Sequence, residues 1–555
     1  MLKRAAKLVL LAAFVAFGVA APERAAPAGP SSLIYVVRYD HWSQDDERDY
    51  RAFIQAIGES SCNTLDACLH GPANPFRDSD LPNHRFVSDC SHLPYVLRFY
   101  YAWKRGLPFS YVAQVAPVRP DDRGDLRYTH EGNRVVRRVD VPGGVMTGYA
   151  IIDQILATVN SATYRIHPER DSPPPDFYSP SIDPQSIRAG TVIYDPAGHL
   201  AIVFRVDPDG RIHFFDAHTD YSLTQMFYDL RFAREKPAVG AGFKNWRPLW
   251  LVGAKRRPDG TLSGGHIALA PNKDIPDFSL VQYYGNGPRP PDAGWDKGTF
   301  TLNGETMDYY DYVRAAMAGG QLMFDPLKEV REMANSICYD LHYRAQAVDL
   351  ALAAGMARRP EPERLPENIY GTYGDWEMYS TPSRDARLKT AFKALRDIAE
   401  RFVRMQKDND GIRHLYYFGD DIAGDMLTVY DASTANCSVT YTKSDGSPLT
   451  LRYEEARRRL FAMSFDPYQC AERRWGASDP AELASCKDGP LKQAWYFAEQ
   501  NLRNQLDRTY DARMDYTLDA LKTPGPGKGV PFPPDTDVRA YLLGVIAKEK
   551  QASAN

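Results

Sequence analysis

The sequence predicts an α+β fold, because short β-rich runs between turn sequences fill part of its first half and helical periodicity fills most of its second half. The chain has 555 residues, of which 44% are hydrophobic and 25% charged. This composition is typical of a soluble globular protein with more than one domain, and it excludes a disordered chain and a polytopic membrane protein. The 67 basic and 71 acidic residues leave no positive excess, so we expect no nucleic-acid partner.

The N-terminus has the pattern of a secretory signal peptide. Three positive charges precede an apolar run from Leu8 to Val19, and Gly18-Val19-Ala20 offers small residues for cleavage. The run is shorter than the ~20 residues that a membrane span needs, so an uncleaved anchor is the less favoured alternative. We assign residues 1–21 to the signal peptide and 22–32 to a linker. We expect the mature protein to be exported, either periplasmic or secreted, with no stable membrane insertion.

Seven cysteines are an odd number for a protein of an oxidising compartment, where most thiols pair. Cys62 and Cys68 lie in one short polar stretch, and Cys470 and Cys486 bracket another. Cys338 with Cys437 is then the remaining long-range pair, and Cys90 is the best candidate for the free thiol. Sequence does not fix disulfide connectivity, so other pairings stay open.

The elements of the first half follow from periodicity and turn signals. The sequence predicts a β-rich run at 33–39 and helices at 46–57 and 89–104. Strands are predicted at 191–194, 199–206, 212–217 and 247–252, with the turn sequences 195–198 and 207–210 separating the first three. We therefore expect a helix packed on an antiparallel meander, in a domain that spans residues 33–260.

The second half reads as a separate, mainly helical domain at 308–555, joined by a connecting segment at 261–307. Helical periodicity covers 309–317, 327–356, 384–405, 453–463 and 491–521. A Pro/Gly-rich segment at 522–534 precedes a last helix at 538–550.

The first candidate for chemistry is Cys90, in the stretch Val87 to Tyr95. Proline is tolerated only in the first turn of a helix, so Pro94 places Cys90 at or next to the N-cap. There the free N–H groups and the helix dipole lower the pKa of a thiol and are able to hold an oxyanion. The alternatives are that Cys90 belongs to a structural disulfide, with another cysteine left over, or that it is a small buried residue.

A thiolate nucleophile needs a base, and the strand region provides one. His199 follows a Gly-containing turn and starts a predicted strand, while Asp216 lies on the next strand. Asp216 is therefore placed to accept the imidazole N–H and set the tautomer. Taken alone, a histidine in a strand is more often structural.

This order of motifs resembles the NlpC/P60 and CHAP branch of the papain-like cysteine peptidases. The resemblance rests on Asp89-Cys90-Ser91 opening a helix, on Gly198 to Val203 and on Gly210 to Ala217. It implies a papain-like domain that hydrolyses amide bonds in cell-wall peptides or related isopeptides, with Cys90 as nucleophile, His199 as general base and acid, and Asp216 as orienting residue. The order also resembles transglutaminase-like proteins, in which Asp is the usual third residue and an amine accepts the acyl group.

Other groups rank below this set. His266, in a second Gly-His-x-Ala pattern, is a rival base, and His213, His218 and Asp220 are a metal candidate that strand alternation disfavours. Lys407 to Gly411 resembles part of a calcium loop but lacks its first and last ligands. Tyr370 to Tyr379 is either an aromatic platform for a ligand or, more commonly, packing.

The sequence therefore predicts an exported thiol-dependent hydrolase of peptide or isopeptide bonds, with peptide or peptidoglycan-derived substrates. No cofactor and no metal are expected. The alternatives are a transglutaminase-like acyltransferase and a non-catalytic binding or structural protein that retains the fold.

Overall fold

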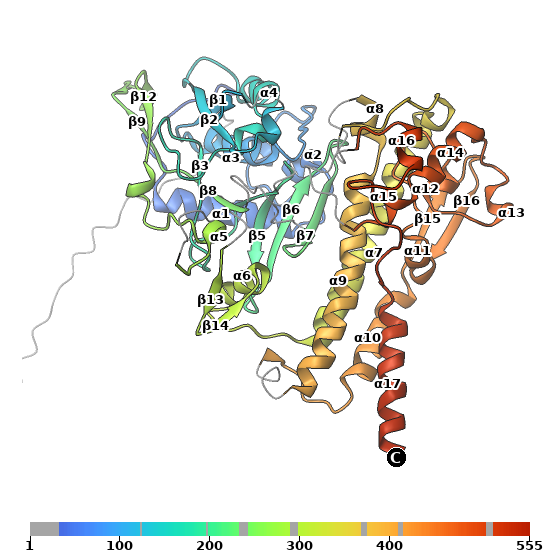
Figure 1. Ribbon diagram of the computed structural model, residues 1–555. Helices are drawn as coiled ribbons and strands as arrows, with labels where there is room; N and C mark the ends of the chain where they lie inside the picture. Colours follow the sequence, from blue (N-terminus) through green and yellow to red (C-terminus); the bar gives the residue numbers. More distant parts are fainter. Residues whose placement is uncertain are drawn as a thin grey trace, which may run out of the picture.

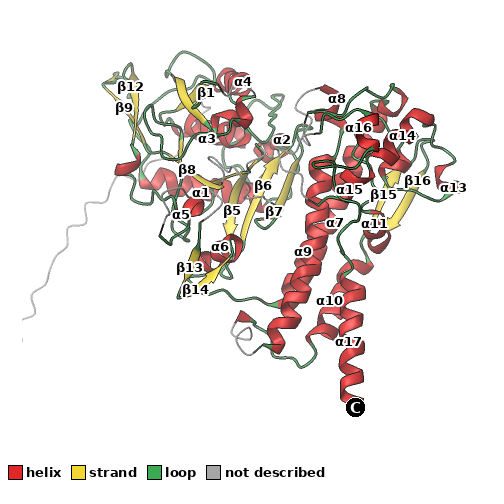
Figure 2. Cartoon of the chain, in the orientation of Figure 1, coloured by secondary structure: helices red, strands yellow, loops and turns green. Residues whose placement is uncertain are grey.

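The computed structural model describes residues 33–121, 125–195, 198–231, 242–288, 298–367, 374–408, 414–506 and 514–554. The predicted signal peptide and linker lie outside these residues. A six-stranded sheet with its helices forms one side of the molecule, and the long helices α7, α9, α10 and α17 stand beside it on the other side (Figure 1). The fold is thus mixed α/β with an antiparallel sheet, as the sequence predicts at this coarser level (Figure 2).

The N-terminal helices are α1 (Gln44–Glu59), α2 (Leu65–His70), α3 (Leu93–Arg105) and α4 (Gly148–Thr158). Helix α1 begins at a capping box in which the Ser43 and Asp46 side chains bond to each other's backbone N–H groups. The helices predicted at 46–57 and 89–104 are confirmed, although α3 begins later than expected. The strand predicted at 33–39 is wrong, because only Ile34 and Val37 form isolated bridges there, to Thr147 and Leu262.

The central sheet has the strand order β3-β8-β4-β5-β6-β7, and all its pairings are antiparallel. Its strands are β3 (Phe177–Tyr178), β4 (Val192–Tyr194), β5 (Leu200–Val206), β6 (Ile212–Ala217), β7 (Leu223–Phe227) and β8 (Gly242–Trp246). Alternate residues of β5 enter two different cores: Leu200 and Ile202 pack with α1 and α3, whereas Ala201 and Val203 pack with α6 (Tyr309–Met317). The meander predicted over 191–217 is therefore confirmed.

The strand predicted at 247–252 is confirmed in a shorter form, and it lies outside the central sheet. The chain leaves the central sheet after β8, passes Pro248, and enters β9 (Leu249–Val252), which pairs with β12 (His266–Leu269). Proline has no N–H for a ladder hydrogen bond, so it marks the break between the two strands. Further short pairs are β1 (Ser110–Pro117) with β2 (Asn133–Asp140), β10 (Lys255–Arg256) with β11 (Leu262–Ser263), and β13 (Phe300–Leu302) with β14 (Glu305–Met307).

The second half is built on α7 (Pro326–Ala353), α9 (Pro382–Lys407), α10 (Ile422–Ala435) and α17 (Val538–Ala554). These four helices share one core with the hairpin of β15 (Ser438–Thr442) and β16 (Pro448–Arg452). The shorter helices are α5 (Val281–Tyr284), α8 (Gly374–Tyr379), α11 (Tyr453–Arg459), α12 (Ala471–Arg474), α13 (Pro480–Leu483), α14 (Pro490–Ala498), α15 (Gln500–Asn504) and α16 (Leu518–Lys522). The helices predicted at 309–317, 327–356, 384–405, 453–463 and 538–550 are confirmed, the fourth in a shorter form.

One long helix predicted at 491–521 is wrong. The chain turns extended at Gln505, and α16 starts anew at Thr517, whose side chain accepts a hydrogen bond from the Ala520 N–H. A threonine that caps a new helix competes with continuation of an old one. None of the described helices is both long and apolar enough to cross a membrane.

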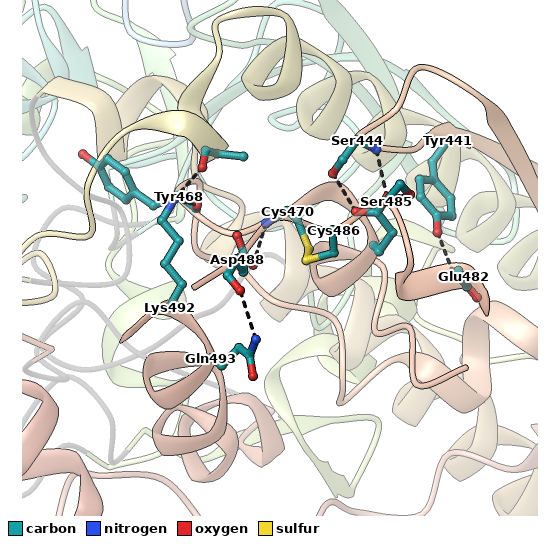
Figure 3. The surroundings of a disulfide bond; sticks show 12 residues. Tyr441, Ser444, Tyr468, Cys470, Glu482, Ser485, Cys486, Asp488, Lys492 and Gln493 are labelled. Atoms are coloured by element: carbon teal, nitrogen blue, oxygen red, sulfur yellow. Dashed lines mark hydrogen bonds between the residues drawn. A yellow bond between two sulfur atoms is a disulfide. The ribbon is translucent and has the colours of Figure 1, made fainter. Parts of the chain in front are cut away.

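The three predicted disulfides are confirmed: Cys62 with Cys68, Cys338 with Cys437, and Cys470 with Cys486. Figure 3 shows the last of them, where the Asp488 carboxylate accepts a hydrogen bond from the Cys470 N–H at 3.0 Å. Cys90 is the free cysteine. Three disulfides are consistent with a protein of an oxidising compartment.

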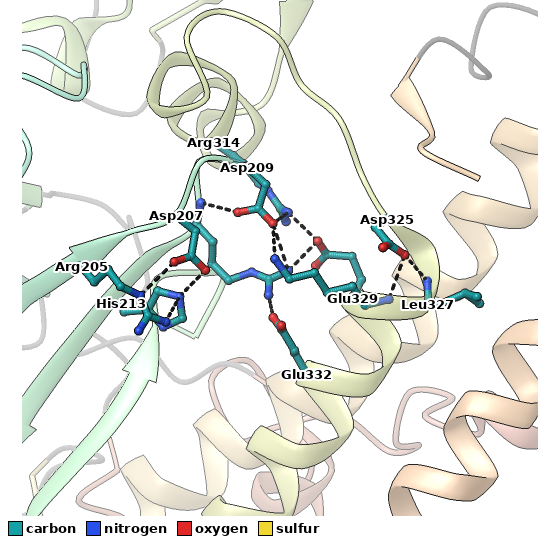
Figure 4. Close-up of polar contacts among 11 residues, drawn as sticks. Arg205, Asp207, Asp209, His213, Arg314, Asp325, Leu327, Glu329 and Glu332 are labelled. Atoms are coloured by element: carbon teal, nitrogen blue, oxygen red, sulfur yellow. Dashed lines mark hydrogen bonds and ion pairs between the residues drawn. The ribbon is translucent and has the colours of Figure 1, made fainter. Parts of the chain in front are cut away.

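Charged side chains join the β5–β6 turn to the helices of the second half (Figure 4). Glu329 of α7 accepts hydrogen bonds from Arg211 at 2.7 Å and from Arg314 of α6 at 2.5 Å. Asp209 in the turn accepts one from Lys328 at 2.8 Å. The residues after the predicted boundary at 260 contact the first half through the pairing of β12 with β9. The residues after the boundary at 308 contact it through α6, which packs on the sheet. Both domain boundaries therefore stay predictions.

Candidate active site

Cys90 lies in a turn directly before α3, two residues ahead of the N-cap residue His92. Pro94 is the second residue of the helix. The Asp89 carboxylate accepts hydrogen bonds from the N–H groups of Ser91 at 2.9 Å and His92 at 3.1 Å. The expected position of Cys90 at the helix start holds only approximately, and these two N–H groups already have an acceptor, so they are not the expected oxyanion donors.

The surroundings of Cys90 favour the neutral thiol. Burial raises the pKa of the Cys90 thiol, and the negative charges of Asp89 and Asp216 add to that rise. A hydrogen bond from the Leu200 backbone and the positive charge of Arg387 act in the opposite direction. The net shift of the thiol pKa is therefore upward, opposite to the lowering expected from a helix start.

His199 immediately precedes β5, after Gly198, whose φ of 88° lies in the region that glycine adopts readily. Its Nε2 lies 2.6 Å from the Asp216 carboxylate. The pKa of His199 is lowered to about 4 by burial and by the charge of Arg387, which together outweigh the opposing bond to Asp216. The imidazole is therefore neutral at pH 7. Since a carboxylate only accepts, Nε2 carries the proton and Nδ1 is the basic nitrogen.

Asp216 is fully buried in β6 and holds two hydrogen-bond donors in place. Besides His199 it accepts a short hydrogen bond from the Thr224 hydroxyl, which in turn lies 2.9 Å from Nε2 of His218. Burial raises the pKa of Asp216, but the charge of His218 and the hydrogen bonds from His199 and His218 keep it well below its ordinary value. The sequence prediction that Asp216 orients the imidazole agrees with this geometry.

One pocket is lined by both Cys90 and His199. His218 also lines it, on the side of the first half. Asp89, Ser91, His92, Arg127, Asn160 and Ser161 are further lining residues from the first half. Another wall comes from the second half, where α8, the loop after it and the first turns of α9 contribute Glu377, Ser380, Pro382, Ser383, Arg384 and Arg387. Sequence reasoning missed this wall completely, since its residues lie more than 150 positions from His199 and carry no motif.

No family model, curated protein or solved structure matches this chain. The likeness to papain-like peptidases and to transglutaminase-like proteins therefore stays a prediction from motif order. Any argument for function has to come from the geometry of the pocket.

The remaining candidates do not join this pocket as expected. His213 is bound to Asp207 at 2.8 Å, away from His218, and Asp220 accepts from Ser222, so the proposed metal set is not brought together. A different trio, His199, Asp216 and His218, has ligand atoms within 4.8 Å of one another, but these atoms already hydrogen bond to each other, directly or through Thr224.

Three weaker candidates are resolved differently. His266 is exposed on β12 and does not line the pocket of Cys90. Residues 370–373 of the aromatic segment lie outside the described part of the chain, while Trp376 is buried against Tyr468 as ordinary packing. Residues 409–411 of the calcium-like loop also lie outside it.

Proposed function

We propose that the protein is a thiol-dependent hydrolase of amide bonds in peptides or isopeptides, with Cys90 as nucleophile, His199 as base and acid, and Asp216 as the residue that orients the imidazole. The observation that carries the proposal is the shared pocket of Cys90 and His199, in which Nε2 of His199 is bound to a buried carboxylate. In this proposal, Nδ1 of the neutral imidazole is the atom that takes the thiol proton.

The reaction begins from an uncharged pair of groups. The Cys90 thiol passes its proton to Nδ1 of His199 while sulfur attacks the amide carbonyl carbon, and the Asp216 carboxylate stabilises the imidazolium that forms. The proton then moves to the amide nitrogen, the C–N bond breaks, and an acyl thioester stays on Cys90. The Leu200 backbone and the charge of Arg387, which both favour the thiolate, stabilise the negative charge as it develops on sulfur.

The acyl group then passes to an acceptor. With water as acceptor, His199 removes a proton from the water, which attacks the thioester carbonyl and restores the thiol. An amine acceptor would make the protein a transglutaminase-like acyltransferase, and the carboxylate at the third position favours that second candidate. Turnover with and without a primary amine separates them, because an acyltransferase converts the substrate to the amide of that amine in preference to the free acid.

Two substitutions in the full chain test the proposal. Cys90→Ala and His199→Ala are each expected to lower hydrolysis of peptidoglycan-derived peptides by about 10³-fold or more, because each removes a partner of one covalent step. The matched control is His213→Ala, a histidine of the same sheet that is bound to Asp207 outside the pocket. Hydrolysis that persists in the Cys90 variant would refute the proposal, whereas a wild type without hydrolytic activity would favour a binding or structural protein.

A further inference from the structure

The first turns of α9 bring two arginines into the pocket of Cys90. Arg384 and Arg387 are three residues apart, so they lie on the same face of the helix, and both line the pocket. Ser383 of the same turn lines it as well. The second half of the protein therefore presents positive charge to the thiol and imidazole of the first half.

Arg384 is held in a fixed position beside the β6–β7 turn. Its guanidinium donates a hydrogen bond to the Tyr343 hydroxyl at 2.8 Å and lies 4.0 Å from the Asp220 carboxylate. Its Nε is buried and has no hydrogen-bond partner within the described part of the chain. The ring of Tyr343 packs against that of His218, 4.5 Å away. Arg384 is therefore held by Tyr343 and Asp220 while it lines the pocket.

Arg387 is the positive charge that acts on both reactive groups. It lowers the pKa of the Cys90 thiol and that of the His199 imidazole. Arg387 also lines the same pocket as Cys90 and His199. A ligand group that contacts Arg387 therefore lies close to the atoms that react.

The backbone of α9 adds to the same positive region. The helix has 26 residues, and its N-cap residue Thr381 makes no side-chain hydrogen bond to the first turn. The N–H groups of Ser383 and Arg384 have no acceptor within the helix, as at any helix start. These donors and the helix dipole favour an anion at this end of the pocket.

The acidic residues of the pocket are already bound. Asp89 accepts from Ser91 and His92, and Glu377 lies 4.0 Å from Arg127. They therefore oppose an anion less than isolated carboxylates would.

We infer that Arg384 and Arg387 bind a carboxylate of the substrate, so that the cleaved amide lies within a few bonds of a free carboxylate, as it does near the C-terminus of a peptide. This inference rests on the proposed function and names its substrate class. Arginine suits the role, since its planar guanidinium pairs with both oxygens of a carboxylate. Arg384 and Arg387 are specificity-determining residues, while Cys90 and His199 react.

Alkylation of Cys90 tests the inference without any need for hydrolysis. Iodoacetate and iodoacetamide have the same reactive carbon, but iodoacetate carries a carboxylate where iodoacetamide carries a neutral amide. In both reactions the sulfur displaces iodide, an S–C bond forms as the C–I bond breaks, and the thiol proton leaves to solvent. Because the other six cysteines are in disulfides, the label reports Cys90 alone. The rates are measured at pH 7.5, where His199 is neutral, and compared with those of glutathione.

The ratio of the iodoacetate rate to the iodoacetamide rate is expected to exceed that of glutathione by about tenfold, the smallest effect expected from one charge-assisted hydrogen bond. Arg387→Gln should reduce the ratio to that of glutathione, and Arg387→Lys should restore part of it. Arg539→Gln is the matched control, since Arg539 is bound to Asp431 at 2.9 Å on α10. An unchanged ratio in Arg387→Gln, a wild-type ratio equal to that of glutathione, or no reaction with either reagent would overturn the inference.

A second measurement separates this inference from the proposed function. Peptide substrates are prepared as pairs with a free or an amidated C-terminus, and kcat/KM is measured for the wild type and for Arg387→Gln. We expect the wild type to prefer the free carboxylate, and the variant to lose that preference mainly through KM. Equal cleavage of both forms refutes the inference while supporting the hydrolase. No cleavage of either form, with the iodoacetate preference intact, refutes the hydrolase and leaves only the binding of a carboxylate by Arg387.

Discussion

Replacing Asp216 by Asn tests whether the buried carboxylate holds His199 in its working tautomer. In the wild type both carboxylate oxygens of Asp216 accept a hydrogen bond. One accepts from Nε2 of His199 at 2.6 Å and the other from the Thr224 hydroxyl. The Asn side chain has the same shape but only one accepting oxygen. Its amide group must face either His199 or Thr224 with a donor where an acceptor is needed.

The expected loss follows from these contacts. If the Asn NH2 group faces Nε2 of His199, Nε2 must accept and the imidazole proton lies on Nδ1. His199 then no longer offers Nδ1 as a base. A hydrogen bond to a charged partner contributes about 1.5–3 kcal/mol, which corresponds to a loss of roughly 10- to 150-fold from this bond alone. Loss of the carboxylate also removes the charge that stabilises the imidazolium, so kcat should fall by about 10²-fold or more.

The assay is kcat and kcat/KM for peptide hydrolysis by Asp216→Asn, with thermal unfolding to confirm that the variant is folded. Asp207→Asn is the matched control, because Asp207 binds His213 at 2.8 Å at the other end of the same sheet. Retention of more than half of the wild-type kcat by Asp216→Asn would refute the reasoning. An equal loss in Asp207→Asn would refute it as well.

Three further predictions concern stability, each measured by urea unfolding. The pKa of His199 is about 4 in the folded protein against 6.5 for a free imidazole, so on acidification the unfolded chain binds this proton first. The free energy of unfolding of the wild type should therefore fall by about 3 kcal/mol between pH 6.5 and 4. His199→Gln should lack this part of the fall. The Cys338–Cys437 disulfide spans 99 positions and Cys62–Cys68 only 6. Because a longer closed loop restricts the unfolded chain more, removing the first should lower the free energy of unfolding by about 4.7 kcal/mol and removing the second by about 2.4 kcal/mol. Equal losses would contradict this. Glu329→Gln removes one counter-charge from the buried Arg211 and the partly buried Arg314 and should cost about 3 kcal/mol. A cost below that of an exposed ion pair would contradict it.

Local sequence patterns were sufficient for much of the first half. The turn sequences at 195–198 and 207–210 delimit β5 and β6, and strand alternation then places Asp216 in the core beside His199. The cysteine pairing was also predictable, because the polar stretches around Cys62 and Cys470 each hold two cysteines close in sequence. These features depend on neighbours a few residues apart.

The parts that sequence did not predict depend on long-range packing. Burial decides the pKa of the Cys90 thiol, and burial there depends on which segments cover the turn before α3. Arg384 and Arg387 reach the pocket only because α9 packs beside the sheet, and no local pattern distinguishes them from other helix arginines. The strand predicted at 33–39 failed for a related reason, since its apolar residues are buried by side-chain packing without a continuous strand partner.

The account depends most on the claim that Cys90 carries the acyl group during turnover. The direct measurement is tandem mass spectrometry of protein that is quenched in acid while it hydrolyses a peptidoglycan-derived peptide. We predict a mass increase equal to the acyl portion of the substrate, located on Cys90, with the three disulfides intact and no adduct in His199→Ala. A Cys90 that is found in a disulfide, or hydrolysis that continues in Cys90→Ala without any adduct, would contradict the account.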